Sequence, residues 1–334
     1  MNKKKVAYLG AGAWGYTLAN LLASNGFAVT QWDINTTLTD TLQKTRIHPK
    51  MSDFKAQGTM LFTSDFHQAL EGADLIVESV TSQGMRPVFE RLKKENVTVP
   101  IVLTSKGIEQ NTGLLLSEVA LEVLGDEHKQ QVVCLSGPSL AIEVMRKMPT
   151  SVVCSSYNPD AMKVVIDAFT TDYFRVYPNS DMPGVSFGGA VKNIIAIACG
   201  IADGLGFGDN TKAALMTRGL HEIRKLAVVK GCNAETINGL SGMGDLCVTC
   251  LSTHSRNYKF GNFIAEGLTP EQAKEKVGMV VEGAYTCVSA LQLGKKHGIS
   301  LPITEAVYRV LNEGLDPKEA VKQLLTRTVK QEHL

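Results

Sequence analysis

The residues best suited to chemistry lie in one glycine-rich stretch near the end of the chain. Gly239-Leu-Ser-Gly-Met-Gly-Asp245 is followed by Ser255-Arg256-Asn257, so a carboxylate, a guanidinium and an amide fall within one short segment. Glycines allow a backbone to come close to a ligand. A guanidinium suits a phosphate because its planar fork of donors matches the phosphate oxygens. The stretch therefore predicts a site for a small phosphorylated molecule.

Two lysines stand at positions that suit acid–base chemistry. Lys106 follows the apolar run Ile101–Leu103, so we expect it at the carboxyl end of a strand, where open α/β sheets bind ligands. Lys192 lies on a helical run that is otherwise almost wholly apolar. A lysine on such a helix usually extends its ammonium group to the surface. If it is buried instead, desolvation lowers its pKa and it can exchange a proton. Spacing alone leaves both interpretations of Lys192 open.

A second glycine motif lies near the amino terminus. Gly10-Ala-Gly12-Ala-Trp-Gly15 follows a predicted strand directly and opens a predicted helix, which is the context that gives this spacing its meaning. Gly10 would allow the tight turn, Gly12 the close approach of a pyrophosphate, and Gly15 the close packing of helix on strand. The helix N-terminus adds partial positive charge. The motif predicts a bound dinucleotide.

Asp33 lies at the end of the second predicted strand, about twenty residues beyond the glycine motif. A carboxylate there accepts hydrogen bonds from a ribose 2′-hydroxyl and repels a 2′-phosphate. No arginine follows in Ile34-Asn35 to hold that phosphate. We therefore expect NAD to be preferred over NADP. The alternative is that Asp33 merely caps the segment that follows it.

The elements that must position these residues change in kind along the chain. Apolar runs without alternation, typical of strands buried on both faces of a parallel sheet, lie at Val6–Leu9, Ala28–Trp32, Leu75–Val80, Ile101–Leu103, Val132–Leu135 and Val152–Cys154. A helical run over Trp14–Ser24 separates the first two. After about Gly188 only helical patterns remain, with starts marked at Thr269-Pro270 and Asp316-Pro317. We expect an α/β fold, with a Rossmann-type dinucleotide-binding domain over residues 1–189 and an all-helical substrate-binding domain over 190–334.

Composition narrows the classes of partner. The 334 residues carry a net charge of +1, so no global field draws the chain to nucleic acid or to an anionic membrane. Met1–Lys5 resembles a surface lead-in to a strand, without a secretory signal, and Ile194–Ile201 is too short to span a bilayer. Seven cysteines without a regular framework favour reduced thiols, and thus the cytoplasm. The pair Cys247 and Cys250, with His254 close behind, lacks a convincing fourth ligand, so we expect packing there and no metal site.

Many segments, in order over nearly the whole length, carry a resemblance to one family. The chain resembles the NAD(P)-dependent glycerol-3-phosphate dehydrogenases of the soluble bacterial type. The matching segments are Gly10-Ala-Gly-Ala-Trp-Gly15, Ser105-Lys-Gly107, Leu135-Ser-Gly-Pro138, Gly188-Gly-Ala-Val-Lys-Asn193, Ala202-Asp-Gly-Leu-Gly-Phe-Gly208, Thr217-Arg-Gly219, Gly239–Leu246, Ser255-Arg-Asn257, Val280-Val-Glu-Gly283 and Leu301-Pro-Ile-Thr-Glu305.

This resemblance implies reversible hydride transfer between NAD(P)H and dihydroxyacetone phosphate, giving sn-glycerol 3-phosphate, the backbone precursor of glycerophospholipids. It implies that Lys192 is the catalytic proton donor and acceptor, that Lys106 touches both cofactor and substrate, and that Asp245 orients the substrate and the lysine. Further substrate-contacting positions are Gly137, Ser139, Ser255, Arg256 and Asn257. Further cofactor-contacting positions are Ala13, Trp14, Ala141, Arg256, Val280 and Glu282.

The chain departs from the family pattern in places. Ser139 stands where threonine is common and keeps the hydroxyl, whereas Ile142 replaces a common lysine and removes its charge. Asp33 and its neighbours replace residues that are often basic.

Two other functions stay open: a related dehydrogenase acting on 6-phosphogluconate or a hydroxyacid, and a nucleotide-binding regulatory module without turnover. We expect a homodimer formed through the helical domain.

Overall fold

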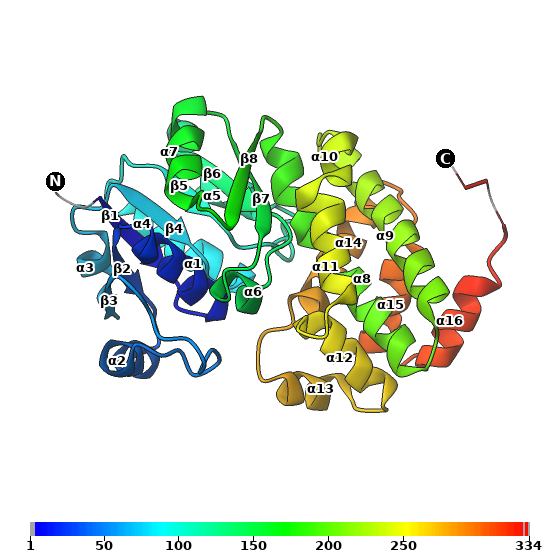
Figure 1. Cartoon of the computed structure of the whole chain (residues 1–334). Coiled ribbons are helices and arrows are strands. Elements are labelled where there is room, and N and C mark those ends of the chain that lie inside the picture. The colour runs from blue at the N-terminus through cyan, green and yellow to red at the C-terminus, as the bar shows by residue number, and fades with distance from the viewer. Residues whose placement is uncertain (1–3, 330, 333–334) are drawn as a thin grey trace.

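The computed structural model describes residues 4–329, 331 and 332. Residues 1–3, part of the expected lead-in Met1–Lys5, lie outside the described residues, as do residues 330, 333 and 334 at the end of the expected helical domain. An α/β lobe and a helical lobe lie side by side (Figure 1). The α/β lobe comes first in the chain, so the order of the two fold types is the one that the sequence predicted.

One eight-stranded sheet forms the centre of the α/β lobe. The strand order is β3-β2-β1-β4-β5-β6-β7-β8. The strands from β1 to β6 pair in parallel, β7 runs antiparallel to β6, and β8 runs parallel to β7. Their bounds are β1 Lys5–Leu9, β2 Ala28–Trp32, β3 Thr59–Thr63, β4 Leu75–Glu78, β5 Ile101–Leu103, β6 Val132–Ser136, β7 Thr150–Ser156 and β8 Phe174–Asn179.

Helices cover both faces of this sheet, which explains why its central strands are apolar without alternation. In β1, Val6 and Tyr8 pack on one face, and Ala7 and Leu9 pack on the other. The first face is covered by α1 (Ala13–Ser24), α6 (Ala141–Met145) and α7 (Pro159–Phe169). The second face is covered by α3 (Phe66–Leu70), α4 (Met85–Lys93) and α5 (Leu116–Leu124), while α2 (Thr36–Thr45) follows β2.

The register of the parallel strands gathers their carboxyl ends at one edge. Leu9 pairs with both Trp32 and Glu78, and Glu78 pairs in turn with Leu103. The segments that follow these residues therefore emerge next to one another. The glycine motif, Asp33 and the loop with Lys106 share this edge because their strands end in register.

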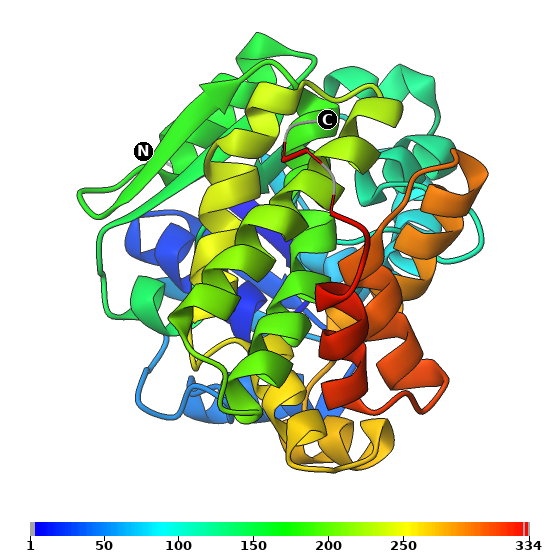
Figure 2. The same ribbon diagram turned by 90° about the vertical axis from the view of Figure 1, so that its right-hand side faces the viewer.

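The helical lobe is built around α8, a helix of 23 residues from Met182 to Gly204. Figure 2 looks onto this lobe, where the green and yellow-green helices α8 and α9 run through the middle and the red α16 packs beside them. The remaining helices are α9 Asp209–Val229, α10 Ala234–Asn238, α11 Asp245–Leu251, α12 Arg256–Ala265, α13 Pro270–Val277, α14 Glu282–Lys296, α15 Pro302–Asn312 and α16 Pro317–Leu325, with short helical turns η1 Ser82–Gly84, η2 Asp126–Gln130 and η3 Leu240–Gly244.

α8 belongs to both lobes. Met182 and Val185 pack in the core under the sheet, whereas Phe187 and the residues after it pack in the helical core. The expected domain boundary between residues 189 and 190 falls inside this continuous helix. One helix thus joins the two cores.

Within the described part of the chain, α8 alone is long and apolar enough to cross a membrane. The run Ile194–Ile201 is too short by itself to span a bilayer, but the apolar helix that contains it is longer than the run. Most of the apolar stretch is buried by the surrounding helices. α8 is the core helix of its lobe.

The six strands and the three marked helix boundaries predicted from the sequence are all present. α1 ends at Ser24 before Gly26, whose φ is 96°, and the side chains of Thr269 and Asp316 cap α13 and α16. The sequence analysis missed β3 and β8. Both lie at the edges of the sheet, where one face is exposed and the apolar run is broken.

Candidate active site

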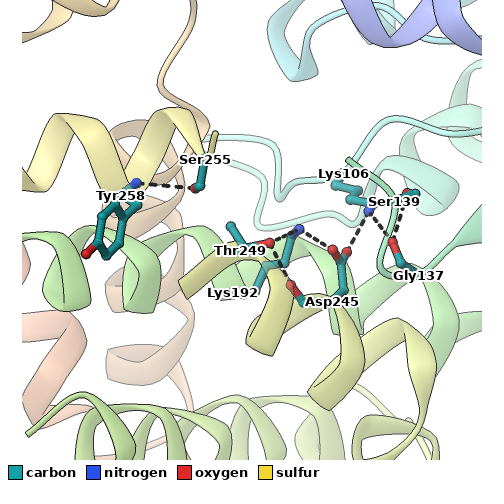
Figure 3. Close-up of polar contacts among 8 residues, drawn as sticks. All are labelled: Lys106, Gly137, Ser139, Lys192, Asp245, Thr249, Ser255 and Tyr258. Atoms are coloured by element: carbon teal, nitrogen blue, oxygen red, sulfur yellow. Dashed lines mark hydrogen bonds and ion pairs between the residues drawn. The ribbon is translucent and has the colours of Figure 1, made fainter. Parts of the chain in front are cut away.

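Two lysines and one aspartate form a buried cluster where the sheet edge meets the helical lobe (Figure 3). Nζ of Lys106 lies 2.5 Å from Oδ2 of Asp245, and Nζ of Lys192 donates to Oδ1 of the same carboxylate. Asp245 is 1% exposed and Lys192 is 7% exposed. Each carboxylate oxygen therefore contacts one ammonium group, that of Lys192 in a buried position and that of Lys106 in a partly exposed one.

The three residues come from separate elements. Lys106 lies in the loop after β5, Lys192 lies in the middle of α8, and Asp245 begins α11. All three were candidates from the sequence, and the family resemblance already paired Asp245 with the catalytic lysine; the structure adds that Lys106 contacts the same carboxylate. The question left open for Lys192 is answered in favour of burial, because its ammonium group contacts Asp245 instead of reaching the surface.

The glycines of the opening motif bring protein backbone together. A Cβ on Gly188 in α8 would lie 2.6 Å from the carbonyl oxygen of Ser241, and a Cβ on Gly242 would lie 2.0 Å from that of Ile237. We had expected the glycines of residues 239–244 to admit a ligand. At Gly242 the close neighbour is instead the protein's own backbone, and the close packing of η3 on α8 carries Asp245 to Lys192.

The electrostatics of the cluster favour proton exchange at Lys192. Burial lowers the pKa of Lys192 to about 8, with the charge of Lys106 acting in the same direction and the carboxylate of Asp245 opposing it. An amine with a pKa near physiological pH populates both the ammonium and the neutral form. Lys192 can therefore donate and accept a proton under ordinary conditions.

Three further groups complete the cluster. Lys106 Nζ donates to the carbonyl oxygen of Gly137 at 3.2 Å, and Ser139 Oγ donates to the same oxygen at 3.0 Å. Lys192 Nζ also donates to Thr249 Oγ1 at 2.6 Å, and that hydroxyl donates to the backbone oxygen of Asp245 at 2.6 Å. Thr249 was not predicted from the sequence. Its position four residues after Asp245, on the same face of a helix, is the signal that identifies it.

The segment Ser255-Arg256-Asn257 lies at the start of α12, apart from the lysine cluster in Figure 3. Ser255 Oγ accepts the backbone N–H of Tyr258 at 3.3 Å, and Asn257 Oδ1 accepts that of Gly283 at 2.9 Å. Arg256 is exposed, and its guanidinium makes no hydrogen bond to another described residue. A helix N-terminus beside an available guanidinium suits an anion.

The cofactor motif has the backbone geometry that a close-packed phosphate loop needs. Gly10 has a φ of 103°, and a Cβ on Gly15 would lie 2.3 Å from the carbonyl oxygen of Gly10. Gly12 is exposed, and a Cβ there would meet nothing within 4 Å. Ala13 and Trp14 begin α1 directly after it. The loop leaves open space at Gly12, in front of the helix N-terminus.

Asp33 is already engaged by backbone groups. Its Oδ2 accepts the N–H of Ala11 at 2.7 Å, and its Oδ1 accepts that of Asn35 at 2.9 Å. The carboxylate thus braces the glycine motif and also caps the turn that follows it. Each oxygen keeps a further lone pair, so these bonds do not prevent a ribose hydroxyl from binding.

The remaining predicted cofactor positions lie on the two sides of the junction between the lobes. Ala141 begins α6 and is partly buried, while Val280 precedes α14 and is 39% exposed. Glu282 Oε2 accepts a hydrogen bond from Ser82 Oγ at 2.7 Å, across the two lobes. Lys50 Nζ makes a second contact across the lobes, to the carbonyl oxygen of Gly278 at 2.8 Å.

We expected the pair Cys247 and Cys250, two of the seven cysteines, to serve packing. All seven are free, and Cys250 is buried in the helical core beside the lysine cluster. Among residues 4–329, 331 and 332, no group of three or more histidine, cysteine or acidic side chains is placed to hold a metal ion. Cys250 packs among apolar side chains of the helical core.

A Rossmann-type sheet joined to a helical domain, with paired lysines where they meet, defines the class of two-domain nicotinamide-dependent dehydrogenases. Comparison with known families shows which family within this class the chain matches. The family model for the N-terminus of NAD-dependent glycerol-3-phosphate dehydrogenase matches residues 5–162, and the model for its C-terminus matches residues 181–322. The chain belongs to the NAD-dependent glycerol-3-phosphate dehydrogenase family.

Full-length relatives agree with this assignment. The glycerol-3-phosphate dehydrogenase [NAD(P)+] of Protochlamydia amoebophila is 57% identical, over 99% of this chain and 100% of the relative. The protein of the same description from Chlamydia trachomatis is also 57% identical, with the same coverage. The crystal structure of glycerol-3-phosphate dehydrogenase from Coxiella burnetii superimposes with a TM-score of 0.93 at 39% identity, covering 97% of this chain and 99% of that chain.

Proposed function

We propose that this chain reversibly reduces dihydroxyacetone phosphate to sn-glycerol 3-phosphate with NAD(P)H, and so supplies glycerophospholipid synthesis. The observation that carries the proposal is the shared carboxylate of Asp245, which holds Lys106 and Lys192 together where the two lobes meet. Family membership names the substrate, and the lysine cluster supplies the acid–base group that this reaction needs.

Lys192 is the proton donor and acceptor in this proposal. During reduction, negative charge develops on the carbonyl oxygen of the substrate, and an ammonium group directed at that oxygen stabilises the charge and then gives up a proton. The bound nicotinamide would supply the hydride in this direction. Asp245 orients both lysines, and Lys106 lies between the sheet edge and the helical lobe, where it can touch cofactor and substrate.

The phosphate group of the substrate is assigned to the start of α12. Arg256 offers a guanidinium, and Ser255 and Asn257 flank it at the helix N-terminus. A phosphate held there is remote from the reacting carbon, so its binding energy can orient that carbon. The backbone of Gly137 and the hydroxyl of Ser139 border the cluster on the opposite side.

The cofactor is assigned to the carboxyl edge of the sheet. Gly10, Gly12 and Gly15 form the phosphate loop, and Asp33 lies beside it for the adenosine ribose. We propose that NAD is preferred, since the Asp33 carboxylate would repel the 2′-phosphate of NADP. The test is kcat/KM for NADH against NADPH; a clear preference for NADPH contradicts this part of the proposal.

The activity itself is tested by following absorbance of the nicotinamide with purified protein. We expect oxidation of NADH when dihydroxyacetone phosphate is added, and no reduction of NAD+ when 6-phosphogluconate or short hydroxyacids are added. Turnover of those other substrates in preference would replace the proposed one. Cofactor binding without any turnover would support a regulatory module instead.

The assembly and location of the protein belong to the same proposal. We propose a homodimer formed through the helical lobe, where Val228, Val229 and Leu325 expose apolar side chains. Light scattering during size-exclusion chromatography should give the mass of two chains, and the mass of one chain would contradict it.

A cytoplasmic location is supported by the seven free cysteines, since a reducing compartment keeps thiols in this state.

A further inference from the structure

A second buried acidic residue lies at the end of β4, in contact with the loop that carries Lys106. Glu78 is fully buried, and no lysine, arginine or histidine among the described residues forms an ion pair with it. Its Oε2 has no hydrogen-bond partner within the part of the chain that the structure describes. A buried carboxylate without a cation is costly, whereas the neutral acid is far less so.

The hydrogen bonds around Glu78 contain one proton too few if the side chain is ionised. Ser105 Oγ lies 2.5 Å from Glu78 Oε1 and 2.5 Å from the carbonyl oxygen of Val80. A hydroxyl carries a single hydrogen, and a carbonyl oxygen can only accept. Ser105 can satisfy both contacts only by donating to Val80 and accepting from Glu78, which requires a proton on Oε1.

The neutral acid fits the third contact as well. Oε1 of Glu78 lies 2.6 Å from the backbone N–H of Val80, and the hydroxyl oxygen of a carboxylic acid can accept there while it donates to Ser105. Burial raises the pKa of Glu78 to about 7, against the opposing hydrogen bonds from Ser105 and Val80. Geometry and electrostatics favour the same protonation state.

The consequence for the lysine cluster follows from the chain itself. The backbone oxygen of Glu78 accepts hydrogen bonds from Thr104 N at 3.1 Å and from Thr104 Oγ1 at 2.8 Å, while its side chain contacts Ser105. Glu78 thus holds the two residues that precede Lys106. We propose that Glu78 is a neutral acid that acts through Ser105 to position Lys106 for the proposed reaction.

This inference rests on the proposed function, and its first test compares Ser105→Ala, Ser105→Thr and Glu78→Gln in the dihydroxyacetone phosphate assay. Ser105→Ala removes the hydroxyl. Glutamine at position 78 is neutral, but no single atom of its amide can both accept from Val80 and donate to Ser105. We expect each of these two variants to lower kcat roughly tenfold, below the ~100-fold that a misplacement of about 1 Å can cost.

Three controls separate positioning from a loss of folding. Ser105→Thr restores the hydroxyl and should recover kcat. The double variant Glu78→Gln with Ser105→Ala should lose no more activity than the less active of the two single variants. Both changes break the same hydrogen bond between Glu78 and Ser105. Glu222→Gln, at a buried acid in the helical lobe, should lower the urea midpoint and leave kcat within about twofold.

The protonation state has a readout that does not depend on activity. The infrared difference spectrum of wild type minus Glu78→Gln at pH 6 should contain the carbonyl band of a protonated carboxylic acid. Its absence overturns the inference, as does an unchanged kcat in Ser105→Ala. A wild-type protein that fails to oxidise NADH with dihydroxyacetone phosphate would instead overturn the proposed function, and the infrared band would still decide the state of Glu78.

Discussion

At the scale of single residues, burial changes the acid–base chemistry of Lys192. Its pKa of about 8 means that the ammonium form predominates below this pH and the neutral amine above it. Reduction needs the ammonium form as donor, and oxidation needs the amine as acceptor. We expect kcat/KM for dihydroxyacetone phosphate to fall as pH rises through about 8, and kcat/KM for sn-glycerol 3-phosphate to rise over the same range. Profiles that change in the same direction would contradict the assignment.

Removing the amine should abolish most turnover. Lys192→Ala is expected to lower kcat by roughly 10²–10⁴-fold, the usual contribution of general acid–base catalysis, while the substrate still binds. Steady-state kinetics measure the effect, and Lys276→Ala, which changes an exposed lysine paired with Glu266, serves as the control. A near-normal kcat in Lys192→Ala would exclude this lysine from the catalytic role.

Arg256 should affect binding more than turnover. Charged hydrogen bonds contribute about 1.5–3 kcal/mol, so Arg256→Ala should raise KM for dihydroxyacetone phosphate by roughly 10- to 100-fold. The phosphate is distant from the reacting carbon, so kcat should change less. Lys259→Ala changes an exposed cation on the same helix and should leave KM unaltered. A lower kcat with an unchanged KM would argue against a phosphate site at Arg256.

At the scale of elements, a carboxylate from one helix stabilises the start of another. Glu222 of α9 accepts the backbone N–H of Ile303 at 2.6 Å and that of Thr304 at 3.1 Å, so it satisfies donors in the first turn of α15. The N-cap residue of α15, Leu301, provides no side-chain hydrogen bond. A buried side chain from elsewhere in the sequence thus replaces a local cap.

This arrangement predicts a loss of stability without a loss of chemistry. Glu222→Ala leaves buried N–H groups unpaired and should lower the free energy of unfolding by roughly 1–3 kcal/mol. Glu222→Gln keeps one acceptor oxygen and should lose less. Urea unfolding measures both, with kcat as the internal control. Equal stability of wild type and Glu222→Ala would show that water satisfies these donors.

The elements also show where sequence reasoning reaches its limit. Central strands such as β1 and β4 were readable because burial on both faces requires a continuous apolar run. The edge strand β8 buries Phe174 and Val176 but exposes Arg175 and Tyr177. That alternation of apolar and polar residues indicates a strand, although less strongly than a continuous apolar run does. In β3, the apolar Leu61 occupies an exposed position at the sheet edge, so apolar and polar residues do not alternate along this strand.

At the scale of the whole molecule, α8 couples the two lobes. Because the helix packs in both cores, we expect the lobes to unfold together. Both tryptophans, Trp14 and Trp32, lie in the α/β lobe, whereas most helical residues lie from α8 onward. Tryptophan fluorescence and far-UV circular dichroism should therefore give coincident urea transitions. Separate midpoints would show that α8 does not couple the lobes.

By itself, the sequence determined the two kinds of domain, their order, the cofactor motif and the candidate residues to which we assign the chemistry. These properties are local, because short runs of residues determine strand burial, helix capping and glycine geometry. Only the tertiary structure decided that Lys106 and Lys192 share one carboxylate, that Thr249 joins them, and that Glu78 is buried against Ser105 with no cation paired to it among the described residues. Such relations depend on packing between residues far apart in the chain. Burial then sets the pKa of Lys192, and this pKa cannot be predicted from any local sequence pattern.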